Sequence, residues 1–338
     1  MTLIGPVADD SLLGFARATG WGDDLPAMRD RDIPDVAVAD GEVFLAYRDP
    51  ASIVVCDLDG GFGRVVGLGV IERPHGVTVA GGRIYVVDES RHTIHVFERS
   101  GEWASSFGSG PSDPGFPAAG LHPTRITRPH GPFTRPTRLA VAPDGDIYVS
   151  DGYGNCRIHR FAPDGQALRL SWGSPGTKPG AFNIPHSVDV DRQGRVLVCD
   201  RENDRIQVFD QEGGFVEQWQ DLHRPQAIAE AKDGVLYVAE GAWGPGYVSP
   251  TQGPVEPCPS RVSVLAPDGR RLGTIGPGDD ADVPADFVSA HGIAVDSDDD
   301  LYVVECLASL RANSGVPGAG APAGVPTDRP AVQKLRHS

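Results

Sequence analysis

Short segments in which apolar and polar residues alternate recur along the whole chain. Residues 145–149, 195–198 and 235–238 read GDIYV, RVLV and VLYV, and each follows a turn of the Asp-Gly or Gln-Gly type. Alternation with a period of two next to such turns is typical of half-buried β-strands joined in hairpins. Further strands are predicted at residues 93–97, 157–161, 205–209 and 261–265.

These strands belong to a repeat. Six segments open with Pro or Ala and reach the polar end of a second strand 14 or 15 residues later. The opening residues are Pro34, Pro74, Pro136, Pro185, Pro225 and Ala290, and the polar ends are Arg48, Asp88, Asp151, Asp200, Glu240 and Glu305. Third and fourth strands follow in the same order. Four strands repeated six times predict an all-β fold, a six-bladed β-propeller.

The repeat also predicts the extent of the blades and how the ring closes. As one domain over 1–338, the blades lie at approximately 32–67, 68–108, 134–173, 180–220, 221–276 and 284–338. The last blade has a third strand at 332–335 but no fourth strand after it, whereas residues 15–22 resemble the fourth strands elsewhere. We expect this N-terminal strand to complete the last blade. Residues 109–134 and 307–329 break the period and are predicted to be long loops.

Composition agrees with one large all-β unit and narrows the choice of partners. Of 338 residues, 43 are glycine and 30 are proline, and 40% are apolar, which is enough for a core. The net charge of −16 argues against nucleic acid or an anionic membrane as a partner. Five cysteines without CxxC pairs indicate neither a disulfide framework nor a cysteine zinc site. With no visible signal peptide, we expect a cytoplasmic protein.

Three histidines occupy one repeated position. In a propeller the first strand of each blade lines the central channel, so its start and the end of the antiparallel second strand lie at the same mouth. The residues that ring this mouth are Asp35, His75, Thr137, His186, Gln226 and His291. Histidines on alternate blades are a third of a turn apart and should converge, as in a catalytic zinc site. The alternative, that histidine merely begins a strand, explains one such residue better than three.

The same mouth carries three departures from the repeat. Arg48 stands where every other blade has an acid, Tyr153 lies at a one-residue insertion, and Arg201 directly follows the acid of blade 4. Functional residues are expected where a repeat is broken. Loop packing explains Tyr153 and Arg201 equally well from position alone, so both interpretations stay open.

The residues of this mouth resemble the peptidyl-α-hydroxyglycine α-amidating lyases. The likeness is carried by SDGYGN at 150–155, FNIPHS at 182–187 and DRENDRIQ at 200–207, the last of which also resembles the NHL propeller signature. It extends over all six blades and is strongest over residues 134–210. The resemblance implies one zinc held by His75, His186 and His291, with Tyr153, Arg201 and Arg48 as catalytic residues.

The resemblance also implies a reaction and its partners. An N-substituted α-hydroxyglycine, which is a carbinolamide, would lose its C–N bond and give an amide and glyoxylate. The expected partners are a small anionic substrate, or a modified peptide, and an oxygenase upstream in the pathway. Gly154 stands where the family has a disulfide-bonded cysteine. Gly292 stands where it has an aspartate for structural calcium, which argues against calcium, although the carbonyl of Val77 remains available.

Two other functions fit parts of the sequence. A propeller hydrolase acting on lactones or phosphoesters normally holds a hard cation with carboxylates and amides, whereas this mouth offers imidazoles. A non-catalytic NHL-type interaction platform would use the channel mouth to bind a peptide or protein. It predicts no stoichiometric metal, so about one zinc per chain distinguishes the lyase from the platform.

Overall fold

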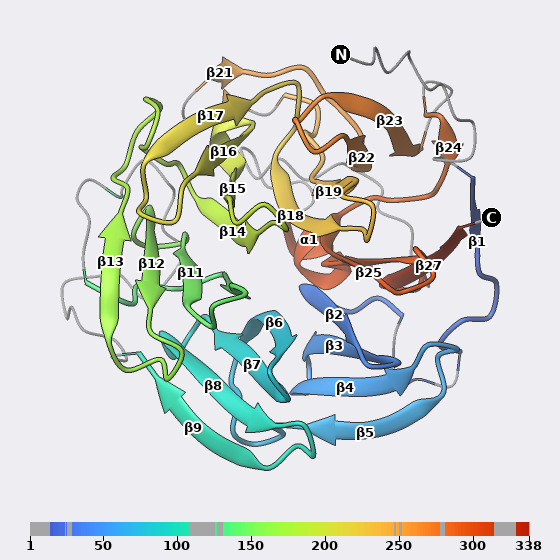
Figure 1. Cartoon of the computed structure of the whole chain (residues 1–338). Coiled ribbons are helices and arrows are strands. Elements are labelled where there is room, and N and C mark those ends of the chain that lie inside the picture. The colour runs from blue at the N-terminus through green and yellow to red at the C-terminus, as the bar shows by residue number, and fades with distance from the viewer. Residues whose placement is uncertain are drawn as a thin grey trace, which may run out of the picture.

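The strands are arranged as six sheets around a central axis, seen in the computed structural model of the chain (Figure 1), and all their pairings are antiparallel except that of the last two strands of blade 5. The structure describes residues 14–23, 25, 29–108, 126, 131–246, 248–249, 252–277, 281–313 and 329–337. Each sheet is one blade, so the prediction of a six-bladed β-propeller is confirmed.

Blades 1 to 4 each consist of four strands that are consecutive in the chain and neighbours in the sheet, whereas blade 5 leaves out a small hairpin and blade 6 takes its outer strand from the N-terminus. Blade 1 contains β2 (Asp35–Ala39), β3 (Glu42–Arg48), β4 (Ala51–Asp57) and β5 (Phe62–Val66), and blade 2 contains β6 (Pro74–Ala80), β7 (Arg83–Asp88), β8 (Thr93–Glu98) and β9 (Trp103–Phe107). Blade 3 contains β10 (Arg138–Val141), β11 (Ile147–Asp151), β12 (Arg157–Phe161) and β13 (Leu168–Trp172), and blade 4 contains β14 (Pro185–Val190), β15 (Val196–Asp200), β16 (Arg205–Phe209) and β17 (Phe215–Trp219). Blade 5 contains β18 (Pro225–Glu230), β19 (Leu236–Glu240), β22 (Arg261–Leu265), β23 (Arg271–Gly276) and β24 (Val283–Pro284), and blade 6 contains β25 (Ala290–Val295), β26 (Leu301–Glu305), β27 (Val332–His337) and β1 (Phe15–Arg17).

Side chains close the tight turns between these strands. In blade 4, Asp191 Oδ1 accepts hydrogen bonds from the backbone N–H of Gln193 at 3.0 Å and of Arg195 at 2.8 Å. An aspartate that bonds the backbone two residues on forms an Asx turn, which is why Asp and Gly recur at these positions of the repeat.

The hydrophobic core is divided among the spaces between blades. Phe107 of blade 2, Phe133 and Phe161 of blade 3 pack together, with the ring centroids of Phe107 and Phe161 5.5 Å apart. A comparable buried cluster lies between each other pair of adjacent blades, including blades 6 and 1. Apolar burial on both faces of each sheet therefore fixes the angle between blades and the positions of the channel-lining strands.

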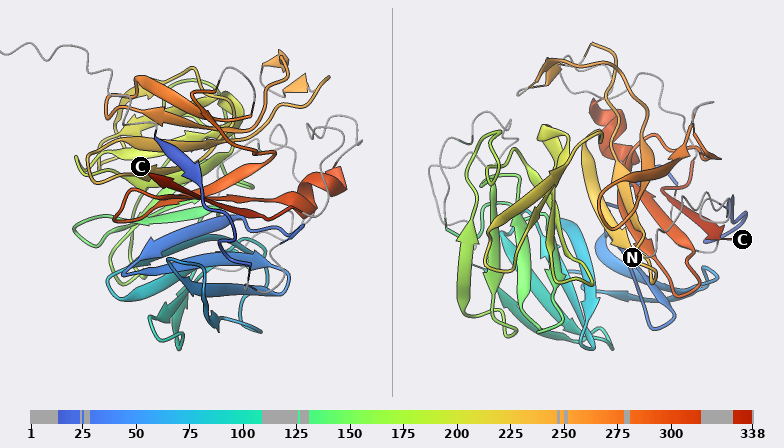
Figure 2. Two further views of the ribbon diagram at one scale, coloured as in Figure 1. Left: turned by 90° about the vertical axis from the view of Figure 1, so that its right-hand side faces the viewer. Right: turned by 45° about the horizontal axis from the view of Figure 1, so that its top comes forward.

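The N-terminal strand closes the ring, as predicted. β1 pairs antiparallel with β27 and becomes the outer strand of blade 6, and the left view of Figure 2 shows the blue β1 beside the dark red β27. The strand ends at Arg17, whereas the sequence predicted a strand as far as residue 22. Residues 19–23 form turns instead, where Trp21 packs edge-on against Tyr302 at 5.5 Å and donates from Nε1 to Leu58 O at 2.9 Å.

The long loops differ in part from their prediction. Residues 307–329 were predicted to be a loop, but they begin with the helix α1 (Leu307–Asn313), in which Leu310 N bonds Cys306 O at 3.1 Å. The glycine and proline that suggested a loop lie further on, at 314–328, and these residues are outside the described part, as are 109–125 and 127–130. Residues 241–258 of blade 5 carry the small hairpin β20 (Val248–Ser249) and β21 (Gly253–Pro254).

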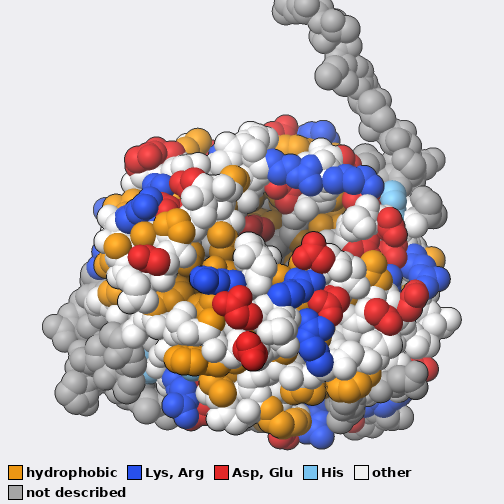
Figure 3. Space-filling view, turned by 60° about the horizontal axis from the view of Figure 1, so that its bottom comes forward, with side chains coloured by type: hydrophobic (Ala, Val, Ile, Leu, Met, Phe, Trp, Pro, Cys, Tyr) orange, Lys and Arg blue, Asp and Glu red, His pale blue; other side chains and the backbone are white. Residues whose placement is uncertain are grey.

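No helix in the described ranges is long and apolar enough to cross a membrane. The surface mixes both signs of charge: Figure 3 shows Lys and Arg interspersed with Asp and Glu around a central hollow. The net charge of −16 is therefore not gathered on that side.

Candidate metal centre

The three histidines lie at equivalent β-bulges. In β6, β14 and β25 the pairing with the second strand skips one residue between Pro74 and Gly76, Pro185 and Ser187, and Ala290 and Gly292. The skipped residues are His75, His186 and His291. A bulge leaves its extra residue out of the ladder and re-aims its side chain. The irregularity that turns each imidazole toward the channel therefore recurs with the repeat.

The bulges bring the three imidazoles together. Their ring centroids are 4.9 Å apart for His75 and His186, 5.1 Å for His75 and His291, and 4.7 Å for His186 and His291. All three side chains are buried, and their ligating atoms lie within 4.8 Å of one another. Among the described residues, this is the one group of three or more His, Cys, Asp or Glu that could hold a metal ion.

Backbone carbonyls set the tautomer of each ring. His75 Nδ1 lies 2.8 Å from Thr137 O, His186 Nδ1 lies 2.9 Å from Gln226 O, and His291 Nδ1 lies 2.7 Å from Pro34 O. A carbonyl only accepts, so every Nδ1 donates and every Nε2 is left unprotonated. Each carbonyl belongs to the following blade. Such outer partners orient metal-binding histidines and fix their tautomer.

The rings are neutral as well as oriented. Burial, assisted by the charges of Arg48 and Arg201, lowers the pKa of His291 to about 3. Burial also holds the pKa of His75 and His186 well below 6.5. Neutral imidazole is the form that binds a metal ion.

Tyr153 contacts two of the three histidines. Its Oη lies 2.9 Å from Nε2 of His75 and 2.9 Å from Nε2 of His186. The loop after β11 carries it there because Gly152 packs against blade 4, where an added Cβ would lie 2.3 Å from Pro185 O. Burial raises the pKa of the Tyr153 phenol, and the nearby Arg201 and Arg48 offset this only in part. The phenol is therefore protonated at neutral pH.

Arginines surround the tyrosine. The guanidinium carbons of Arg135 and Arg201 lie 5.4 Å and 5.5 Å from the centroid of the Tyr153 ring, within cation–π range. Arg201 Nη1 lies 3.5 Å from Tyr153 Oη. Arg48, at the end of β3, places Nη1 3.4 Å from Asp32 Oδ2 and 3.3 Å from Ser309 Oγ of α1.

Two buried glutamates hold these arginines. Glu202 Oε1 accepts from Arg201 Nε at 2.8 Å and from Arg224 Nη2 at 3.0 Å. Burial raises the pKa of Glu202, but Arg224 and Arg201 outweigh burial and lower it overall. Glu89 pairs with Arg135 and lies 3.8 Å from Arg48 Nη2. Glu202 thereby holds two guanidinium groups, and Glu89, which also lies 3.6 Å from Arg73 Nε, holds three.

All six residues singled out in the sequence come together in the structure. A cavity of about 170 Å³ is lined by Arg48, Tyr153, Arg201 and His291, with His75 and His186 behind the tyrosine, and α1 supplies Ser309 and Leu310. Sequence reasoning missed the two glutamates and Arg135. A signal existed for Glu89, since it follows the acid of blade 2 as Arg201 follows the acid of blade 4.

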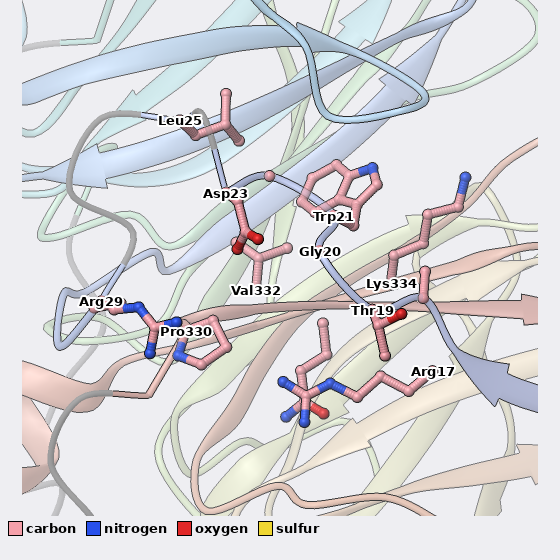
Figure 4. A pocket seen from close by; sticks show the side chains of 13 residues that line it. Arg17, Thr19, Gly20, Trp21, Asp23, Leu25, Arg29, Pro330, Val332 and Lys334 are labelled. Atoms are coloured by element: carbon pink, nitrogen blue, oxygen red, sulfur yellow. The ribbon is translucent and has the colours of Figure 1, made fainter.

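A larger cavity lies elsewhere. It measures about 590 Å³ at the seam between the N-terminal segment and β27, lined by Arg17, Trp21, Arg29 and Lys334 among others (Figure 4). None of the six residues singled out in the sequence lines it. It arises where the chain ends close the ring, and it is separate from the histidine cluster.

Comparison with known proteins identifies NHL repeats and lyase relatives. The family model described as NHL repeat matches residues 72–97, 133–161 and 182–209. The chain is 37% identical over 191 residues to peptidyl-glycine alpha-amidating monooxygenase A of Xenopus laevis, covering 53% of this chain and 19% of that protein. It is 33% identical over 217 residues to NHL repeat-containing protein 3 of Mus musculus, covering 59% of each.

A third relative carries the lyase name alone. It is a probable peptidyl-alpha-hydroxyglycine alpha-amidating lyase of Caenorhabditis elegans, 33% identical over 147 residues, covering 42% of this chain and 38% of that protein. The chain thus spans less than two thirds of the length of these curated relatives. Among solved structures, a streptogramin B lyase matches with a TM-score of 0.56 at 12% identity, covering 97% of this chain and 99% of that one, which shows the shared fold.

Proposed function

We propose that this NHL-repeat propeller, which is related by sequence to the peptidyl-α-hydroxyglycine α-amidating lyases, is a zinc-dependent lyase. Its reaction is cleavage of the C–N bond of an N-substituted α-hydroxyglycine to an amide and glyoxylate. The observation that carries the proposal is the set of three neutral, tautomer-fixed imidazoles beside a protonated tyrosine and two arginines.

The donor set fits zinc. Three imidazole nitrogens with a further position left for water or substrate are typical of catalytic zinc, whereas calcium and magnesium prefer oxygen ligands. His75, His186 and His291 would hold the ion through Nε2, because each Nδ1 is committed to a carbonyl. Zinc bound there would lower the pKa of the substrate hydroxyl and stabilise its alkoxide.

The cavity fits an anionic substrate. Arg48, Arg201 and Arg224 line it, and no Asp or Glu is among the described residues of its wall. A guanidinium binds a carboxylate through paired charge-assisted hydrogen bonds. Arg48 and Arg201 therefore hold the carboxylate that becomes part of glyoxylate. We propose that a hydroxylating oxygenase supplies this substrate by oxidising the α C–H bond of the corresponding N-substituted glycine.

Tyr153 moves the proton that the reaction requires. The hydroxyl of the carbinolamide loses its proton, the C–N bond breaks with its electron pair on nitrogen, and the nitrogen gains a proton. A protonated phenol can give its proton to the leaving nitrogen while it accepts that of the hydroxyl. Arg201, at 3.5 Å from the phenol oxygen, stabilises negative charge that develops there.

Metal content and glyoxylate release test the proposal. Purified protein is expected to contain about one zinc per chain and to release glyoxylate from N-acyl-α-hydroxyglycines, measured by elemental analysis and a coupled glyoxylate assay. Activity should disappear on chelation and return with zinc. Absence of zinc would favour a non-catalytic platform, and zinc without glyoxylate release across varied acyl groups would contradict the proposed reaction.

Replacement of Arg201 tests carboxylate binding. Arg201→Lys is expected to raise KM for the α-hydroxyglycine at least about 10-fold, because an ammonium group does not reproduce paired guanidinium hydrogen bonds. Arg192→Lys, at an exposed turn of the same blade, is the matched control and should leave KM unchanged. Steady-state kinetics at fixed zinc measure both, and an unaltered KM in Arg201→Lys would remove this residue from substrate binding.

A further inference from the structure

A second, much smaller cavity adjoins the histidines. It measures about 10 Å³ and is lined by the three imidazoles together with Asp35, Arg138 and Gln226, whereas Tyr153 and Arg201 do not line it. It therefore lies on a different side of the cluster from the proposed substrate cavity. Asp35 and Arg138 are called the channel pair below.

The channel pair is a cross-channel ion pair. Arg138 Nη1 of β10 in blade 3 lies 3.3 Å from Asp35 Oδ1 of β2 in blade 1. Asp35 is 2% exposed, and its Oδ2 accepts from Val77 N of β6 at 2.9 Å. The pair thus ties together the first strands of three consecutive blades.

The pair also adjoins the groups that orient the histidines. Asp35 follows Pro34, whose carbonyl accepts from His291, and Arg138 follows Thr137, whose carbonyl accepts from His75. Any shift of β2 or β10 would therefore displace a carbonyl that sets an imidazole. The separation of Asp35 and Arg138 is coupled to the geometry of two of the three rings.

Structural calcium, which the sequence makes doubtful because Gly292 replaces the aspartate of the lyase family, does not fit here. An added Cβ at Gly292 would lie 2.7 Å from Asp35 Cα and 2.8 Å from Asp35 Oδ1, so no aspartate can occupy that position without rearrangement. A cavity of about 10 Å³ holds at most one water, whereas calcium takes 6–8 oxygen ligands. The Asp35 carboxylate already faces a cation, the guanidinium of Arg138.

We propose that Arg138 takes the place of a bound cation in this channel. Through its ion pair with Asp35 it holds the histidine cluster in position without calcium. A guanidinium supplies the positive charge that a buried carboxylate needs. The positive charge of Arg138 also acts on a second acid of the channel, Asp189 of β14. Burial raises the pKa of Asp35 and of Asp189 to about 6, and in both cases Arg138 opposes the rise.

Stability measurements test the pair without reference to activity. Arg138→Met leaves Asp35 buried without a counter-charge, so its melting temperature is expected to fall by at least roughly 5 °C. Arg138→Lys keeps the charge and should recover most of that loss. Asp35→Asn combined with Arg138→Met should also be more stable than Arg138→Met alone. Arg157→Met, an arginine of the same blade bonded to the carbonyl of Ser171, is the control and should change little.

Calcium and zinc titrations complete the test. In calcium-depleted buffer, millimolar calcium should leave the melting temperature of the unmodified protein unchanged within about 1 °C. Zinc affinity should fall roughly 10-fold in Arg138→Met, as for loss of an outer partner of a metal ligand, but not in Arg157→Met. Calcium-dependent stability, or Arg138→Met with native stability and zinc affinity, would overturn the proposal. The stability outcomes hold whether or not the protein is a lyase.

Discussion

His186→Ala is expected to purify with less than about 0.1 zinc per chain and to release glyoxylate at least about 1,000-fold more slowly than the unmodified protein. Loss of an outer partner of a metal ligand costs roughly 10–100-fold, and loss of a ligand must cost more. The remaining pair, His75 and His291, offers two nitrogens where a catalytic zinc site has three protein ligands. Elemental analysis and the glyoxylate assay measure the two effects on one preparation.

His223→Ala is the matched control. His223 lies in the loop before β18, and its backbone N–H donates a hydrogen bond to Glu240, which the substitution leaves in place. It should keep both zinc and activity. We expect circular dichroism to show that His186→Ala is folded, because the deleted imidazole otherwise bonds only Gln226 O and Tyr153 Oη. A folded His186→Ala protein with full zinc content would contradict the three-histidine site.

The repeat made most of this site predictable. A residue offset of 14 or 15 between the start of strand one and the end of strand two is a local property of each hairpin, so it can be counted along the chain. Because the six blades surround one axis, residues at the same position of the first strand in different blades point toward that axis and come close together. The structure adds the reason for the orientation of His75, His186 and His291, which is the bulge at each of these positions.

Residues that act across blades could not be predicted in the same way. Glu202 matters because it accepts from Arg224, which is 22 residues away, and Asp35 matters because Arg138 meets it across the channel. These contacts depend on the width of the channel and on the reach of each side chain. Neither can be obtained by counting residues along the repeat. The same holds for α1, whose contact with Arg48 is made over 261 residues of sequence.

The charged residues of the site form two layers, with arginines at the cavity and glutamates behind them. The protein is acidic overall, yet arginines line the proposed substrate cavity and the acids Glu89 and Glu202 stand behind them. Buried carboxylates orient the guanidinium groups and offset part of their charge. A negatively charged substrate, as proposed, would meet guanidinium groups that are already oriented and largely desolvated in the folded protein, and this would strengthen its hydrogen bonds with them.

Tyr153→Phe is expected to keep about one zinc per chain and to lose at least about 100-fold in kcat. General acid–base groups contribute roughly 10²–10⁴-fold, and the substitution removes only the hydroxyl oxygen. The three imidazoles keep their carbonyl partners, so metal binding does not depend on the phenol. Because burial raises the pKa of the phenol, Tyr153 would begin the proposed reaction as a proton donor, a role that phenylalanine cannot take.

Tyr148→Phe is the control for this variant. Tyr148 belongs to the same blade, donates to Gln211 O at 3.3 Å and lies under Arg160 at 5.5 Å, so it loses an equivalent hydroxyl beside an equivalent cation. It lies outside the cavity wall and should keep full kcat. Zinc content and kcat together separate the two roles assigned to the site. An active, zinc-loaded Tyr153→Phe enzyme would assign proton transfer to another group, whereas loss of zinc would make the tyrosine part of the metal site itself.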